Sequence, residues 1–540
     1  MRISGHIIDI RKRRIYDGEI EVADGIIHSI KEIGKVDDQV ILPGFIDAHV
    51  HIESSMVVPS EFARMAVVHG TVATVSDPHE IGNVIGIDGV EYMIENGKQV
   101  PFKFYFGAPS CVPATPFETS GGVIDTAHVA SLLEKKEVRY LAEMMNWPGV
   151  LDGDPDVMAR IECAKRNNKV VDGHAPGLRG EQARKYAAAG ISTDHECFTA
   201  PEALDKLSFG MKILIREGSA AKNFDALAGL INDHWENMML CSDDKHPDSL
   251  EAGHINLLVK RALAMKIDLF KILTTACINP VDHYKLDVGT LSPGDPADFI
   301  VIDNLVDFRI TKTFINGILV AENGKTKIAH APSPLINNFF GSERRREEFA
   351  VRATGHTIRV MEALDGQLIT NTLIEAAAIR DGFVVSDTTR DILKIVVVNR
   401  YAESNPSVAF IKNFGLKTGA IASSVGHDSH NIIAVGVDDA SIERVVNLII
   451  RFRGGVAAFD GKQEKILPLP VAGIMSNNDG YVVSKAYQEI DRMAKQMGSK
   501  LGAPFMTLSF MALLVIPALK ISDKGLFDSQ KFEFVDLFVD

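Results

Sequence analysis

The stretch Pro43-Gly-Phe-Ile-Asp-Ala-His49-Val-His51 determines how the rest of the chain is interpreted. Residues i and i+2 of a β-strand point to the same face, so His49 and His51 project into one space. Two neutral imidazoles that share a face suit a zinc, manganese or iron ion. The alternative is a pair of buried histidines hydrogen-bonded to the backbone, and the position of this strand in the chain decides between the two.

This strand is the first of eight in a regular alternation of strands and helices. The strand-like runs end in or near polar residues, at Ile46–Ile52, Thr71–Asp77, Phe102–Ala108, Arg139–Met145, Lys169–Ala175, Gly190–Glu196, Lys212–Glu217 and Met238–Asp243. Most are followed by a helical stretch, such as Asp154–Asn167 or Arg179–Ala189, and the eighth leads into Leu250–Met265. Eight β/α units in about 250 residues predict a (β/α)8 TIM-type barrel, whose catalytic residues lie at the C-terminal strand ends.

The sequence on either side of this alternation predicts two further domains. Residues 1–42 and 285–328 both contain short strands and turns, so we expect one small composite β-domain built from both flanks of the barrel (residues 43–284). A linker at residues 329–346 leads to a separate C-terminal α/β domain at 347–540. Its strand-like and helical runs alternate, at Ile392–Val398, Ala420–Val425, Ile432–Gly436, Ala440–Arg453 and Lys485–Gly498.

Composition narrows the function classes. A chain of 540 residues is too long to fold around one ordinary hydrophobic core, so several domains are expected. Its 46% hydrophobic and 24% charged content is that of a globular protein. The net charge of −14 disfavours nucleic-acid binding. The N-terminus lacks the pattern of a signal peptide, and the longest apolar stretch, Phe510–Leu519, is too short to span a bilayer. Five scattered cysteines indicate no disulfide framework, so we expect a cytoplasmic protein without a membrane partner.

The other strand ends supply further metal ligands. Strand four ends with Glu143, strands five and six with His174 and His195, and strand eight with Asp243. Any one of them alone is more often a structural hydrogen-bonding residue. Buried carboxylates and imidazoles without partners are costly, so a cluster of them facing one cavity predicts bound cations. We therefore expect a metal site at the mouth of the barrel.

This order of ligands resembles that of the amidohydrolase superfamily, and the flanking strands resemble its composite β-domain. The resemblance implies two divalent metal ions per subunit, one held by His49 and His51 and the other by His174 and His195. Glu143 would bridge them, where many relatives have a carboxylated lysine, and Asp243 would ligate the first ion. Such proteins are often isolated with iron or manganese, and the sequence leaves zinc open as well.

Further motifs resemble those of the bacterial and archaeal adenine deaminase family. They are His51-Ile-Glu53-Ser-Ser-Met, Ser76-Asp77-Pro-His79-Glu80, Ser242-Asp-Asp-Lys-His246-Pro, Gly426-His427-Asp-Ser-His430-Asn and Ala503-Pro-Phe-Met-Thr-Leu-Ser-Phe510. The resemblance implies hydrolytic deamination of adenine to hypoxanthine and ammonia in purine salvage, by a hydroxide that two metal ions activate. It also implies a homodimer or larger homo-oligomer. The alternatives are a cyclic amidohydrolase of the dihydroorotase or hydantoinase type, which the missing strand-four lysine disfavours, and a non-catalytic scaffold.

The same resemblance suggests roles for the remaining polar residues. Asp243 is the candidate that takes a proton from the hydroxide and passes it to the departing amine. Glu53 and Glu80 are rival donors of a proton to N1 of the purine, and either could instead orient a metal-bound histidine. Secondary site candidates are His79, Asp244, His246, His427 and His430. The last two could bind a further metal or reach the barrel mouth.

Overall fold

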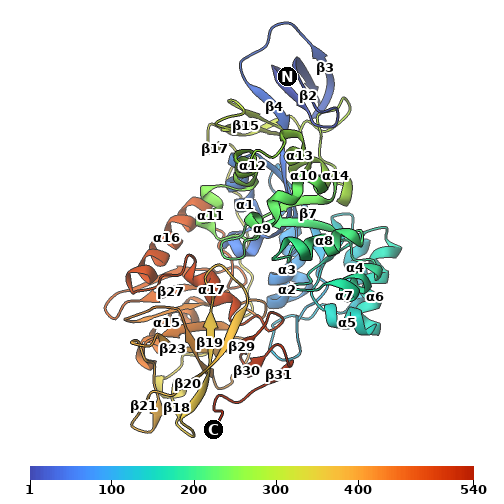
Figure 1. Ribbon diagram of the computed structural model, residues 1–540. Coiled ribbons are helices and arrows are strands. Elements are labelled where there is room, and N and C mark those ends of the chain that lie inside the picture. The colour runs from blue at the N-terminus through green and yellow to red at the C-terminus, as the bar shows by residue number, and fades with distance from the viewer.

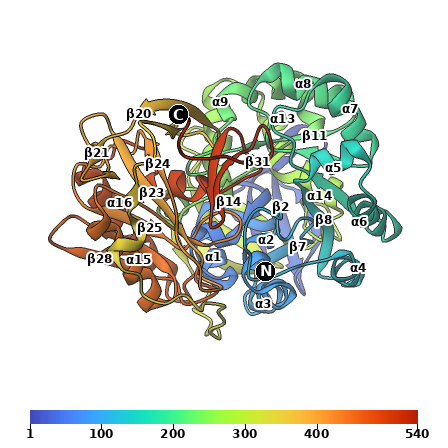
Figure 2. The same cartoon turned by 90° about the horizontal axis from the view of Figure 1, so that it is seen from below.

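The computed structural model describes residues 1–540 and divides into three parts (Figure 1). A β-sheet that contains the N-terminus lies at one end, the barrel lies in the middle, and the C-terminal domain lies at the other end. Viewed from below, the C-terminal domain and the barrel lie side by side (Figure 2).

The middle part is a closed barrel of eight parallel strands. They are β5 (Phe45–His51), β6 (Thr71–Ser76), β7 (Lys103–Ala108), β8 (Val138–Met144), β9 (Val170–Gly173), β10 (Thr193–Asp194), β11 (Lys212–Arg216) and β12 (Met238–Cys241), which β13 (Asp243–Asp244) continues. Parallel pairing runs from β5 to β9 and from β10 to β12, a Val171–Ile191 bridge joins β9 to the chain entering β10, and β13 pairs with β5. The predicted (β/α)8 fold class is confirmed.

Local sequence signals explain the outer helices. In α6 (Pro155–Arg166), the side chain of Asp154 caps the first backbone N–H groups and proline occupies the first turn. Val157, Ile161 and Ala164 then form its buried stripe. The other helices of the barrel region are α1 (Pro59–Ala66), α2 (His79–Ile85), α3 (Ile87–Gly97), α4 (Thr126–Glu134), α5 (Trp147–Asp152), α7 (Gly180–Ala188), α8 (Ala200–Ser208), α9 (Phe224–Leu227), α10 (Ile231–His234), α13 (Leu269–Leu273) and α14 (Asn279–Tyr284).

The helical stretch predicted at Leu250–Met265 is two helices, so the prediction of one continuous helix was wrong. The chain forms α11 (Pro247–Ala252) and α12 (Ile255–Ala264), with Gly253 between them in an extended conformation. At this break the imidazole of His254 is buried and hydrogen-bonded to Asp47 of β5 at 2.8 Å.

The strands on both flanks of the barrel form one eight-stranded sheet. Its order is β17-β16-β15-β14-β4-β1-β2-β3, with β1 (Arg2–Asp9), β2 (Arg14–Ala23), β3 (Ile26–Glu32), β4 (Val40–Pro43), β14 (Phe299–Ile302), β15 (Ile310–Ile315), β16 (Ile318–Glu322) and β17 (Lys325–Thr326). Only Gly44 separates β4 from β5, and a Cβ there would come within 2.3 Å of Val72. Glycine at this position therefore lets the sheet pass directly into the strand that carries the histidine pair.

The C-terminal domain is built on a second eight-stranded sheet, with the order β20-β19-β24-β23-β26-β25-β27-β28. These strands are β19 (Thr357–Ala363), β20 (Thr370–Ala376), β23 (Ile392–Val398), β24 (Ser407–Lys412), β25 (Ala420–Ser423), β26 (Ile432–Gly436), β27 (Gly455–Phe459) and β28 (Glu464–Pro468). Smaller sheets comprise β18 (Val351–Arg352), β21 (Ile379–Arg380) and β22 (Phe383–Val384), and β29 (Leu519–Ser522), β30 (Gly525–Asp528) and β31 (Glu533–Phe534).

Both faces of this sheet are covered. Side chains such as Val396 and Ala434 pack on α15 (Asp439–Phe452). Alternate residues, such as Ile395 and Val435, belong to a core that includes α16 (Gly480–Gln496) and α17 (Pro504–Phe510). Alternation along the strands therefore directs one face outward to α15 and the other toward the barrel.

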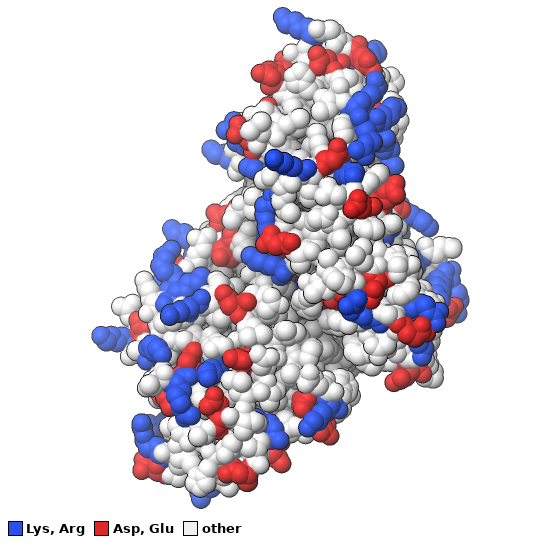
Figure 3. All heavy atoms as spheres, in the orientation of Figure 1, with Lys and Arg blue, Asp and Glu red and all other residues white.

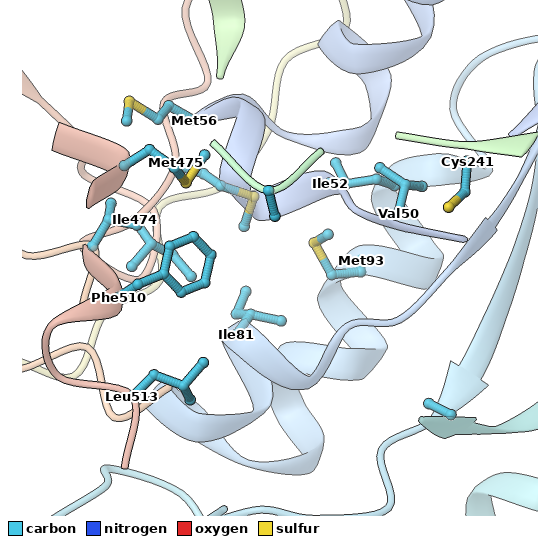
Figure 4. Close-up of a cluster of buried hydrophobic side chains, with 14 of the residues drawn as sticks. Val50, Ile52, Met56, Ile81, Met93, Cys241, Ile474, Met475, Phe510 and Leu513 are labelled. Atoms are coloured by element: carbon cyan, nitrogen blue, oxygen red, sulfur yellow. The ribbon is translucent and has the colours of Figure 1, made fainter. Parts of the chain in front are cut away.

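The C-terminal domain and the barrel share one hydrophobic core. A single cluster of 102 buried residues includes side chains of both parts, so no solvated layer separates them. Figure 4 shows Phe510, Leu513 and Ile474 of the C-terminal domain near Ile81 and Met93 of the barrel. The backbone N–H of Ser476 also donates to the carbonyl of Met56 at 2.8 Å.

Lys and Arg side chains are interspersed with Asp and Glu over the face that Figure 3 shows. No helix in the structure has both the length and the apolar character needed to cross a bilayer.

Because the core is continuous, we expect Ile474→Ala to lower the free energy of unfolding by about 2–5 kcal/mol. The side chain is fully buried at the junction, so its removal leaves a cavity between the two parts. Chemical denaturation followed by circular dichroism measures the change. Val482→Ala is the matched control because Val482 is 61% exposed, and its effect should stay within about 0.5 kcal/mol. Separate transitions for the barrel and the C-terminal domain would contradict the shared core.

Candidate metal centre

The ends of five barrel strands bring six ionisable side chains to the same mouth of the barrel. They are His49 and His51 of β5, Glu143 of β8, His174 and His195 directly after β9 and β10, and Asp243 of β13. Each is at most 5% exposed. The ligand set predicted from the sequence is therefore brought together in space.

Glu143 lies between the two histidine pairs. Its Oε2 is 2.8 Å from Nδ1 of His174 and 3.1 Å from Nε2 of His195, while its Oε1 is 3.4 Å from Nε2 of His51. Burial alone would raise the pKa of this carboxyl group, but the imidazoles of His174 and His195 hold it well below its usual range. Glu143 thus contacts histidines of both pairs.

Asp243 lies against the first histidine pair. Its Oδ1 is 3.3 Å from Nε2 of His51 and 3.6 Å from Nε2 of His49, and the two Nε2 atoms are 3.2 Å apart. The ring of His195 also stacks on that of His49, with centroids 4.1 Å apart. All six side chains therefore form one connected cluster, in which His195 borders both halves.

The donor atoms fit divalent cations. His49, His195 and Asp243 each offer one ligand atom within 4.8 Å of the others, and so do Glu143, His174 and His195. Nε2 of His174 is buried without a hydrogen-bond partner. Imidazole nitrogens combined with carboxylate oxygens are ligands of zinc, iron and manganese, and bound cations would offset the cost of burying these carboxylates.

Arg216 of β11 is a site residue that the sequence interpretation missed. This guanidinium group is 1% exposed, and its two terminal nitrogens hydrogen-bond Glu196 and Asp243, at 2.9 Å and 2.7 Å. Burial would raise the pKa of both carboxyl groups, but the charge of Arg216 contributes to holding Asp243 well below its usual range and Glu196 at about 2. The signal in the sequence that could have identified Arg216 is a charged residue at the end of the otherwise apolar seventh strand.

The backbone at Asp243 is held in an unusual conformation. Its φ is 55°, in the left-handed region that few non-glycine residues adopt. Asp47 of β5 stabilises this turn, since it accepts a hydrogen bond from the N–H of Ser242 at 2.9 Å and one from His254 at 2.8 Å. These contacts aim Asp243 at the first histidine pair.

The two rival glutamates lie in different environments. Glu53 accepts a hydrogen bond from the N–H of Ile81 at 3.2 Å and does not line the cavity at the barrel mouth, and burial raises its pKa to about 7. Glu80, in the first turn of α2, lines that cavity. It contacts two histidines of the C-terminal domain, His427 through Nδ1 and His430 through Nε2.

Of the remaining secondary candidates, His79 and Asp244 line the cavity and His246 does not. His79 lies within the cluster, with Nδ1 3.6 Å from Glu143. Asp244 accepts a hydrogen bond from the hydroxyl of Ser54, and burial together with Asp243 raises its pKa to about 6. His246 instead points away from the cavity and is hydrogen-bonded to the hydroxyl of Tyr487 at 2.6 Å.

The cavity has a polar side and an apolar wall. Its polar lining consists of the six-residue cluster without His49, together with His79, Glu80, Glu196, Asp244, His427 and Asp428. Its apolar lining is Met145, Leu368, Phe510 and Leu513. All of the apolar wall except Met145 belongs to the C-terminal domain. The ring of Phe510 stacks on His427 with centroids 4.6 Å apart and planes 12° from parallel.

Comparison with known proteins agrees with this geometry. Residues 40–320 match the model of the amidohydrolase family, and residues 367–533 match the adenine deaminase C-terminal domain. Adenine deaminase of Salinibacter ruber is 54% identical over 100% of this chain and 99% of its own length. The adenine deaminases of Sulfurovum sp. (strain NBC37-1) and Methanosarcina mazei are 53% and 51% identical, each over 99% of both chains.

The barrel and its strand-end cluster thus define an amidohydrolase with a divalent-metal site. More particularly, the chain belongs to the adenine deaminase family, since the similarity to adenine deaminases covers the whole chain, both the barrel and the C-terminal domain.

We expect replacement of one cluster residue to weaken metal binding. Glu143→Ala removes the carboxylate shared by both halves, so the affinity for divalent metal should fall by at least about tenfold. Metal analysis of dialysed protein by inductively coupled plasma mass spectrometry measures the bound amount. His28→Ala, at an exposed histidine, is the control and should leave the metal content unchanged. Equal metal content in both variants would show that the cluster is not the metal centre.

Proposed function

We propose that this protein hydrolyses adenine to hypoxanthine and ammonia. The observation that carries the proposal is the meeting of the two matched regions at one cavity, where Glu80 of the barrel contacts His427 of the C-terminal domain. Relatives with about half of their residues identical over the full length are named adenine deaminases. The apolar wall suits the face of a flat purine ring.

The metal centre would consist of two divalent ions held by the six-residue cluster. We propose manganese or iron in preference to zinc. Bound cations of this kind lower the pKa of coordinated water to about 7, which supplies a nucleophile at neutral pH. Protein residues must then orient the purine and move two protons.

Asp243 is placed to move the first proton. In the net reaction a C6–O bond forms, the C6–N bond breaks, and the exocyclic nitrogen leaves as ammonia. Asp243 would accept a proton from the hydroxyl group added at C6 and give it to the departing nitrogen. Arg216 keeps this carboxyl group ionised and therefore ready to accept the proton.

We propose Glu80 rather than Glu53 as the donor of the proton to N1. Glu80 faces the cavity, whereas Glu53 is turned toward the N-terminus of α2. Burial would lower the pKa of His427, but Glu80 and Asp244 raise it to about 9, so this imidazole can hold the proton that Glu80 passes on. In this scheme His427 and His430 orient Glu80, and His79 supports the cluster.

The cyclic amidohydrolase alternative is not favoured. Its strand-four lysine is replaced by Glu143, and the C-terminal domain that supplies the apolar wall matches that of adenine deaminases. The assignment to purine salvage, the cytoplasmic location and the homo-oligomeric state remain predictions.

Metal-loaded protein should convert adenine stoichiometrically to hypoxanthine and ammonia. The decrease in adenine absorbance and the enzymatic determination of ammonia measure the reaction independently. Opening of hydantoin or dihydroorotate without turnover of adenine would instead support the cyclic amidohydrolase.

The two glutamates provide a matched pair of variants. We expect Glu80→Gln to lower kcat by about 10²–10⁴-fold, because it removes an acid–base group at the substrate. Glu53→Gln should lower kcat by less than about tenfold, since it alters only a hydrogen bond behind the cavity. Steady-state kinetics at saturating adenine distinguishes the two, and the reverse ranking would contradict the assignment of Glu80.

A further inference from the structure

Lys520 of β29 is a fully buried lysine whose hydrogen bonds go only to backbone carbonyls. Its Nζ donates to the carbonyl of Leu368 at 2.7 Å and to that of Phe510 at 2.9 Å. The side chain is 0% exposed, and burial lowers its pKa to about 7. An amine buried without a carboxylate partner costs free energy that an apolar residue would not, so its two contacts require an explanation.

Both acceptors belong to residues whose side chains line the apolar wall of the cavity. Phe510 is the last residue of α17, where carbonyl groups lack partners within the helix. Leu368 lies in the segment that leads into β20. One amine therefore ties a helix end to a neighbouring loop at the position where both face the site.

Lys520 is itself firmly placed. The hydroxyl of Thr370 donates to the carbonyl of Leu519 at 2.8 Å, and the hydroxyl of Ser522 donates to the carbonyl of Phe117 in the barrel region at 2.8 Å. Strand β29 is thus attached on both sides of Lys520, once to the C-terminal sheet and once to the barrel. The position of the Lys520 amine is therefore fixed relative to both parts, and its hydrogen bonds fix the two wall residues in turn.

We propose that Lys520 is a positioning residue that sets the place of Phe510 and Leu368 against the purine ring. The inference rests on the proposed adenine deaminase activity and concerns substrate binding rather than chemistry. Lys520 contacts no residue of the metal cluster, and its influence passes through the Phe510 ring, which stacks on His427. Its loss should therefore weaken the binding of adenine more than it slows the chemical step.

The test compares Lys520→Met with Lys394→Met. Lys394 is also a buried lysine of the C-terminal domain, and it donates to the carbonyl of Phe349 at 2.9 Å, away from the cavity. Lys520→Met should raise KM for adenine about tenfold and change kcat by less than about threefold, with metal content unchanged. Lys394→Met should leave KM within about twofold, even though it too removes a buried hydrogen bond.

A double-mutant cycle tests whether Lys520 acts through Phe510. Phe510→Leu should reproduce the increase in KM, and the double variant should be less impaired than the product of the two single effects. If Lys520→Met folds poorly, as a thermal melt would show, Lys520→Gln retains a donor and should give a smaller increase in KM than Phe510→Leu. An unchanged KM, a loss of metal, or independent effects in the cycle would overturn the inference. In each case adenine turnover by the unaltered protein shows that the proposed function itself stands.

Discussion

The organisation of this protein depends on the burial of Glu143 among imidazoles at the mouth of the barrel. A carboxylate removed from water is stable only when positive charge or hydrogen-bond donors surround it, and the ends of three strands besides its own contribute imidazoles to the surroundings of Glu143. The barrel must therefore close with every strand in register, so that residues almost 200 positions apart in the chain meet within hydrogen-bond distance. The same demand explains Arg216, whose guanidinium group hydrogen-bonds both Asp243 and Glu196.

The C-terminal domain completes this arrangement rather than merely being attached to it. Its histidines contact Glu80, and its apolar side chains cover the polar cluster. The shared hydrophobic core holds these groups against the barrel. The result is a cavity with charged groups of both parts on one side and an apolar wall, mostly from the C-terminal domain, on the other. Lys520 donates hydrogen bonds to the carbonyls of two residues of that wall, Leu368 and Phe510.

Much of this could be predicted from the sequence, for physical reasons. Strand alternation and the polar residues at strand ends located all eight barrel strands and the six clustered side chains, because parallel strands in a barrel present their C-terminal ends at one rim. The break at Gly253 was missed because the apolar pattern continues across it. The contact of Glu80 with His427, 347 positions along the chain, and that of Lys520 with Leu368, 152 positions away, could not be predicted either, since packing that no short window of the sequence encodes brings these residues together. For the same reason, the choice between Glu53 and Glu80 stayed open until the side chains were placed relative to the cavity.

Anomalous diffraction from crystals of the manganese-loaded protein is the most direct test of this account. We expect two strong peaks at the barrel mouth, one beside His49 and His51 and the other beside His174 and His195, with Glu143 between them. A map with no peak at the barrel mouth, or with Glu143 turned away from every peak, would contradict it.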